Sequence, residues 1–114
     1  MYSYRCTIES VVDADTLDLG IDLGFSVTVS ERVRLANINA VEKRTEKGPK
    51  SIEFVAGWLK GRSLLVSTYK DRNYKDRQEK FGRYLGIISD AATGEVLNDR
   101  LVQEGYAVPF MVIK

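Results

Sequence analysis

The sequence predicts an α+β fold in which two helices pack against a closed, five-stranded β-barrel. Two features of the hydropathy pattern support this prediction. Apolar and polar residues alternate through most of the first forty positions, and such a two-residue period is typical of half-buried strands. The pattern changes to a helical period after Pro49 and again near Val96. The expected order is therefore three strands, a helix, two strands and a second helix.

Five segments have the composition of strands. Short turns containing Asp or Gly separate the first three, which predicts an antiparallel meander. The last two flank a charged stretch at 70–80 that has no apolar period, so we expect an exposed loop there. The five expected strands are Tyr4–Val12, Thr16–Leu23, Phe25–Leu35, Ser63–Tyr69 and Arg83–Ser89.

The first helix is expected between the third and fourth strands. Pro49 stands where a helix can begin, because its missing N–H is not needed in the first turn. Gly61 is well placed to end this helix. We expect Phe54 and Trp58 on a flank of the helix. Its apolar face is predicted from the spacing of Ile52, Val55, Ala56 and Leu59.

The second helix is expected after the fifth strand, with Val96, Leu97, Leu101 and Val102 on its apolar face and Gly105 at its end. The apolar tail at 106–114 is expected to pack as an extended cover. This order of elements fits a barrel of the oligonucleotide-binding (OB) type, which carries a helix between its third and fourth strands.

Length and hydropathy limit the organisation of the chain. Its 114 residues are enough for one core, so we expect a single domain spanning residues 1–114. No segment approaches the ~18 apolar residues of a membrane span, so we expect no membrane association. Residues 1–5 lead straight into a strand-like segment without a signal-peptide pattern. We therefore expect a cytoplasmic monomer, or a secreted one if a leader has been removed.

Two residue counts exclude several kinds of catalysis. The chain has no histidine, so it cannot form a Ser-His-Asp triad, a Cys-His dyad or a histidine-bound metal site. Cys6 is the single cysteine, which excludes an intramolecular disulfide and a thiolate zinc cluster. Any catalysis must therefore use carboxylates, Lys, Arg, Tyr or a metal held by oxygen ligands.

The distribution of charge is uneven although the net charge is only +1. Segments 43–50 and 70–83 each carry +3, which leaves −5 on the rest of the chain. A basic rim on a mildly acidic body would attract a polyanion such as nucleic acid. The alternative is that both segments are solvated loops whose charges keep the protein soluble.

Three short stretches carry the residue types that phosphodiester chemistry needs in the absence of histidine. The first is the turn Val11–Thr16, where Asp13 and Asp15 flank one small residue. The second, at 32–42, is a strand that runs into an acidic loop, and the third, at 80–83, enters a strand after the basic loop. Taken singly, each stretch is ordinary, since Asp often bonds local backbone in turns and strand arginines are usually solvated.

Together the three stretches resemble the staphylococcal nuclease (thermonuclease) family. That family shows a V-x-D-G-D-T turn, an R-L-x-x-I-D-x-P-E segment and a K-Y-G-R segment, in this order and at similar separations. The resemblance extends from about Tyr4 to about Pro109. It implies a calcium-dependent phosphodiesterase, a nuclease that hydrolyses DNA, RNA or both with low sequence specificity.

The resemblance also implies a Ca²⁺ site built from oxygen ligands, which hard cations prefer. Asp15 and Asn39 would supply side-chain oxygens, and Ala40 would supply its backbone carbonyl. Asp13 would orient ligands or water molecules around the metal. Asn39 stands where the family commonly has a second metal-binding Asp, so the resemblance predicts weaker calcium binding in this chain.

The remaining roles carry over in the same way. Glu42 would take the proton from the attacking water or position that water. Arg34 and Arg83 would grip the phosphate and stabilise the transition state, because guanidinium groups match phosphate oxygens in geometry. The residues that would contact nucleic acid around this centre are Lys47, Lys70, Lys80 and Phe81.

Two other functions are compatible with the same sequence. One is a nucleic-acid-binding module that keeps the barrel and the basic segments but has weakened calcium chemistry through Asn39. The other is an interaction domain whose apolar tail docks a partner. Val41 and Phe81, which replace the family's Pro and Tyr, are further departures. Glu42 favours the enzyme, because binding alone does not need a general base.

Overall fold

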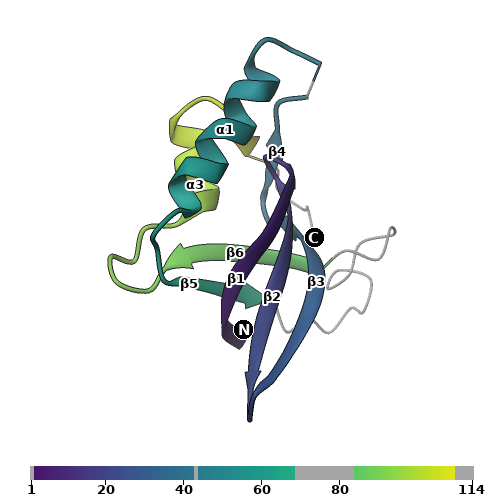
Figure 1. The fold of residues 1–114 in the computed structure, drawn as a ribbon. Helices are drawn as coiled ribbons and strands as arrows, with labels where there is room; N and C mark the ends of the chain where they lie inside the picture. Colours follow the sequence, from purple (N-terminus) through teal and green to yellow (C-terminus); the bar gives the residue numbers. More distant parts are fainter. Residues whose placement is uncertain (1, 43, 69–83, 110–114) are drawn as a thin grey trace, which may run out of the picture.

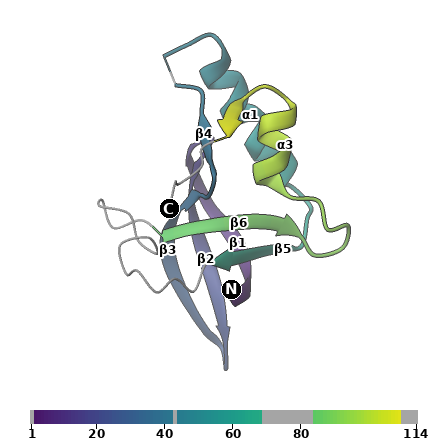
Figure 2. The same cartoon turned by 180° about the vertical axis from the view of Figure 1, so that it is seen from behind.

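The computed structural model describes residues 2–42, 44–68 and 84–109 and confirms the predicted α+β barrel (Figure 1). Five strands close into a barrel in the order β1-β2-β3-β6-β5. Helices α1 (Lys47–Leu59) and α3 (Leu97–Gln103) lie together on one side of it (Figure 2). The barrel strands are β1 (Tyr2–Asp13), β2 (Thr16–Gly24), β3 (Val27–Leu35), β5 (Leu64–Thr68) and β6 (Tyr84–Asp90).

One parallel contact completes the barrel among the described strands. β2 is antiparallel to β1 and β3, and β5 is antiparallel to β1 and β6. β3 and β6 run parallel, from Val33 opposite Tyr84 to Leu35 opposite Gly86. A β-carbon on Gly86 would lie 2.9 Å from Val33 and 3.0 Å from Val66, so the close packing at this point requires glycine.

A second, two-stranded sheet was not anticipated from the sequence. β4 (Ile38–Ala40) pairs antiparallel with β7 (Ala107–Pro109). Strands of three residues are too short to show a two-residue period, so the hydropathy pattern holds no signal for them. The expected extended tail is present through β7, and its remainder at 110–114 lies outside the described residues. The small sheet holds the segment that follows β3 against the segment that follows α3.

The buried face of α1 is rotated from the predicted one. Ala56 is exposed and Ile52 is only half-buried, while Trp58, expected on a flank, is buried. Ser51 completes the buried face because its hydroxyl donates a hydrogen bond to the Gly48 carbonyl at 2.6 Å, which makes burial of this polar side chain tolerable. The buried helical positions are Gly48, Ser51, Val55, Trp58 and Leu59.

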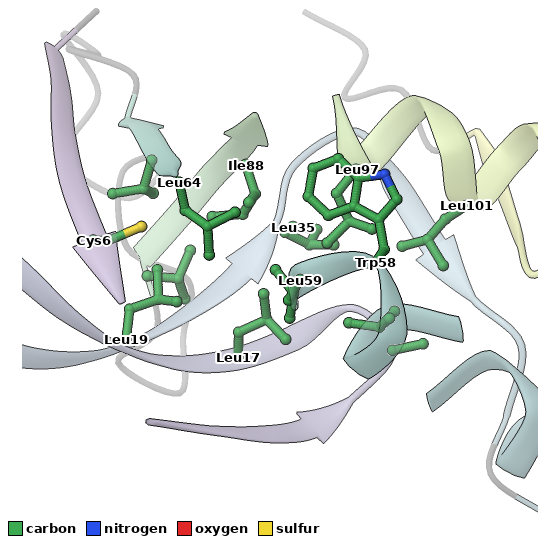
Figure 3. Packing of buried hydrophobic residues seen from close by; sticks show 14 of the residues in the cluster. Cys6, Leu17, Leu19, Leu35, Trp58, Leu59, Leu64, Ile88, Leu97 and Leu101 are labelled. Atoms are coloured by element: carbon green, nitrogen blue, oxygen red, sulfur yellow. The ribbon is translucent and has the colours of Figure 1, made fainter. Parts of the chain in front are cut away.

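The barrel and the helices share one hydrophobic core (Figure 3). Leu17 and Leu35 from the barrel and Leu97 and Leu101 from α3 are fully buried. In the part of the chain that the structure describes, neither helix has the length and apolar character of a membrane span. The labelled members of the core in Figure 3 are Cys6, Leu17, Leu19, Leu35, Trp58, Leu59, Leu64, Ile88, Leu97 and Leu101.

A polar brace joins the end of α1 to the connection between β6 and α3. The Arg62 guanidinium stacks on the Trp58 ring, 4.2 Å from its centroid, and donates a hydrogen bond to Asp90 at 2.8 Å. The Trp58 indole donates to Glu95, and this hydrogen bond, with the nearby Arg100 guanidinium, lowers the pKa of Glu95. The brace therefore fixes α1 relative to β6 through charged groups at the rim of the core.

The β2–β3 hairpin ends in a strained turn. Phe25 and Ser26 form its two-residue loop and have φ angles of 54° and 62°, in the left-handed region. Loops of this kind favour Asn and Gly, because other residues pay a steric penalty for positive φ. The Phe25 side chain is fully exposed, so burial does not offset that penalty.

Replacing Phe25 with Asn and Ser26 with Gly together is expected to raise the free energy of unfolding by about 1–2 kcal/mol, since both substitutions relieve positive-φ strain. Urea denaturation followed by Trp58 fluorescence measures this change. Phe25→Ala is the control, because it removes the ring but keeps the strained backbone, and it should change stability by less than about 0.5 kcal/mol. An equal gain in the control would show that the exposed ring, and not the backbone, causes the instability.

Candidate active site

The turn between β1 and β2 is tied to two segments that follow it in the sequence. Asp13 ends β1 opposite Thr16, and the carbonyl of Asp15 accepts a hydrogen bond from the Leu35 N–H at 2.8 Å. The Asp15 carboxylate accepts from the Thr16 hydroxyl at 3.2 Å and from the Ala40 N–H at 3.1 Å. The acidic turn therefore lies against the end of β3 and against β4.

The segment after β3 is anchored by a buried amide from α3. The Asn98 side chain donates hydrogen bonds to the carbonyls of Ala36 at 3.0 Å and Gly86 at 3.2 Å, and it accepts one from the Ile88 N–H at 3.1 Å. Asn98 is buried, and these three hydrogen bonds satisfy its side-chain amide away from solvent. One side chain thus holds β6 and the start of the site segment in register.

Arg34 lies between the acidic turn and β4. Its Nη2 donates a hydrogen bond to the Asn39 side-chain oxygen and lies 3.7 Å from Oδ2 of Asp15. Its Nη1 donates to the Leu35 carbonyl at 3.3 Å. The Arg34 and Asp15 side chains are 15% and 17% exposed, so their attraction is screened less than that of a surface ion pair. The guanidinium is held in a fixed position beside the carboxylate.

An acidic cavity of about 290 Å³ opens next to this group of contacts. It brings together the Asp13, Asp15 and Glu42 residues with one basic residue, Arg44. The Glu42 side chain is exposed. The Glu42 backbone carbonyl accepts hydrogen bonds from the Thr45 N–H at 3.1 Å and from the Thr45 hydroxyl at 2.7 Å, which fix the local backbone. The complete lining is Asp13, Asp15, Ala40, Val41, Glu42 and Arg44.

A family model described as staphylococcal nuclease homologue matches residues 32–114. The chain belongs to the staphylococcal nuclease homologue family. The match contains the second and third stretches of the predicted site, while the acidic turn precedes it. A search of curated proteins found no match. Membership confirms the resemblance and assigns this staphylococcal nuclease homologue to a nuclease-type family.

In this staphylococcal nuclease homologue, most described site residues converge. The cavity collects Asp13, Asp15, Ala40 and Glu42, and Arg34 and Asn39 contact each other beside Asp15. Two larger hollows, of about 620 and 490 Å³, contain none of the predicted residues. The sequence prediction missed Arg44 as a member of the site, although the basic segment at 43–50 includes it. The predicted residues that lie outside the described part are Arg83, Lys80, Phe81 and Lys70.

Lys47 is separated from the cavity. It begins α1, and its Nζ lies 3.7 Å from the position that a β-carbon on Gly105 would occupy, at the end of α3. Lys47 does not line the cavity that holds the carboxylates. Its predicted contact with nucleic acid therefore requires a substrate long enough to extend beyond the cavity.

The donor chemistry of the site suits a hard cation. The Asp13, Asp15 and Glu42 carboxylates and the Ala40 backbone offer only oxygen ligands, the type that Ca²⁺ prefers. However, over residues 2–42, 44–68 and 84–109, no three His, Cys, Asp or Glu side chains gather closely enough to hold a metal ion. The residues therefore fit calcium by the chemistry of their donor atoms, and any site here would combine carboxylate oxygens with other oxygen ligands.

Proposed function

We propose that the chain is a calcium-dependent nuclease that hydrolyses phosphodiester bonds in DNA, RNA or both with low sequence specificity. The observation that supports this most directly is the acidic cavity, next to which Arg34 is held against Asp15. Phosphodiester cleavage needs a cation for the anionic phosphate and a group that accepts a proton from water. This member of a nuclease-type family carries candidates for both on neighbouring segments.

Calcium would be held by the Asp15 carboxylate and the Ala40 carbonyl, with Asp13 orienting the surrounding ligands. When bound, the ion supplies positive charge that offsets the charge of the phosphate. The resemblance also implies Asn39 as a ligand, yet its side-chain oxygen is already the acceptor for Arg34. The metal site that the cavity supports best therefore consists of carboxylates and one backbone carbonyl.

The chain's own side chains supply the remaining chemistry. Glu42 accepts the proton of the attacking water, and its exposed position in the cavity gives water access to it. Arg34 binds a phosphate oxygen, because the fork of N–H donors on a guanidinium group matches phosphate oxygens in geometry. Arg83 is proposed to bind the same phosphate.

The alternative function is a catalytically weakened nucleic-acid-binding module. Two observations favour it: no three His, Cys, Asp or Glu side chains among the described residues are grouped to hold a metal ion, and Asn39 is neutral. Binding would then use Arg34 and the basic segments and would weaken steeply with added salt, because counterion release drives it.

Incubation with single-stranded DNA in calcium, in magnesium and in chelator separates the two functions. The proposed nuclease cleaves in calcium and stops in chelator. Binding without cleavage in all three buffers would establish the module instead. Cleavage that continues undiminished in chelator would exclude calcium dependence, while the proposed nuclease activity would stand.

A further inference from the structure

We propose that Asn39 is a positioning residue for Arg34 and not a ligand of calcium. The inference rests on the proposed function, because it gives Arg34 a phosphate to bind. Its first support is the direct hydrogen bond from Nη2 of Arg34 to the Asn39 side-chain oxygen. Its second is the place of Asn39 outside the lining of the acidic cavity, although the next residue, Ala40, lines it.

The chemistry of the amide makes the two roles compete. Asn has a single acceptor atom, its carbonyl oxygen with two lone pairs, and Arg34 already donates to one of them. A calcium ion on that same oxygen would place two positive charges side by side on one neutral acceptor, where they would repel each other. A carboxylate could bind the two cations on its two oxygens, but an amide cannot, because its side-chain nitrogen is a donor and does not bind cations. Asn39 therefore suits one cation at a time.

Asp15 is connected to the same guanidinium in a different way. Its Oδ2 accepts the Ala40 N–H at 3.1 Å and lies 3.7 Å from Nη2 of Arg34, beyond hydrogen-bond distance. Asp15 thus attracts Arg34 by charge, whereas Asn39 fixes its direction by a hydrogen bond. This division leaves the Asp15 carboxylate in the cavity wall, available for the metal.

Asn at position 39 also preserves the charge of Arg34. An Asp at this position would form a charge-assisted hydrogen bond, and its negative charge would compensate the positive charge of the guanidinium. The amide holds the group equally close without adding a negative charge, so Arg34 keeps more of its attraction for a phosphate oxygen. The chain thus gives up one calcium ligand and gains a more strongly cationic phosphate contact.

The Asn39→Ala variant tests the assignment in three measurements. In metal-free protein, NMR of the Arg34 guanidinium should show slower rotation in the parent chain than in the variant, where the bond to the Leu35 carbonyl and the attraction of Asp15 remain. Calcium affinity, measured by calorimetry, should be unchanged within error. The rate of single-stranded DNA cleavage in saturating calcium should fall about tenfold, the scale for losing a hydrogen bond to a charged group.

Two further variants control the experiment. Asn39→Asp should restore restricted rotation of Arg34 but weaken metal-free binding of an oligonucleotide, because the new carboxylate neutralises the guanidinium. Gln103→Ala removes an exposed amide from α3, and it should leave the Arg34 signal unchanged. Thermal unfolding of every variant confirms that the fold is retained.

Unchanged rotation of Arg34 in Asn39→Ala would overturn the assignment, and so would a clear loss of calcium affinity, because calcium affinity follows the number and charge of its ligands. If the parent chain neither cleaves DNA nor binds calcium, the proposed function fails. The NMR comparison uses metal-free protein, so it still decides whether Asn39 positions Arg34.

Discussion

Glu42→Gln is expected to lower the rate of single-stranded DNA cleavage by about 10²–10⁴, the range for losing a general base. The substitution preserves the shape of the side chain and one oxygen, but the amide cannot accept the proton of the attacking water. No histidine is present to replace it. Asp13 and Asp15 share the cavity with Glu42, and in the proposed mechanism they serve the metal.

Single-turnover cleavage and oligonucleotide binding, measured on the same preparations, separate the two possible effects of this substitution. Binding should change far less than turnover, since a neutral residue removes only a modest repulsion from the phosphate. Glu53→Gln provides the matched control, because Glu53 is an exposed residue of α1 that does not line the cavity. Undiminished cleavage by Glu42→Gln would refute the assigned base and leave only the carboxylates of the β1–β2 turn as candidates in the cavity.

Asn98→Ala is expected to lower the free energy of unfolding by about 3 kcal/mol. The substitution leaves the carbonyl of Ala36 and the N–H of Ile88 without their side-chain partner in a buried region, while the Gly86 carbonyl keeps its hydrogen bond from the Ala36 N–H at 2.8 Å. Leaving a buried polar group unsatisfied costs about 1–3 kcal/mol, and the expected value allows for some relaxation of the two groups.

Urea denaturation measures this loss. Gln103→Ala is the control, because Gln103 is an exposed residue of the same helix and its replacement should change stability by less than about 0.5 kcal/mol. A loss in Asn98→Ala no larger than that of the control would show that water replaces the amide. It would also remove the reason for regarding Asn98 as the anchor of the site segment.

Much of the fold could be predicted because the long strands expose one face and bury the other. In β2, Leu17, Leu19 and Ile21 are buried at alternate positions as the apolar pattern predicts, although Thr16 and Gly20 on the other face are buried as well. Gly61 and Gly105 have φ angles of 71° and 79°, which explains why both helices end where glycine occurs. The predicted apolar face of α1 is wrong at Ser51. This polar residue is buried because its hydroxyl donates a hydrogen bond to the backbone, and a hydropathy pattern contains no information about that bond.

The site was predictable to the extent that its residues lie in recognisable short patterns. Asp15, Arg34 and Ala40, which belong to the first two stretches, lie close together, and their chemical roles stay predictions. Asn98 had no signal, since a polar residue on a helix is usually solvated and only the tertiary structure reveals its three partners. Arg44 lies in a basic segment, and nothing in the sequence distinguishes it from the other basic residues there.

The parallel pairing of β3 with β6 has a consequence for the growing chain on the ribosome. The β1–β2–β3 meander contains only neighbouring strands and can form early, but the barrel cannot close until β5 and β6 have been synthesised. Asn98 follows later still, so the segment bearing Asn39 and Glu42 lacks its anchor until α3 has been synthesised. We therefore expect this segment of the nascent chain to reach its native position only after α3 has emerged and packed against the barrel.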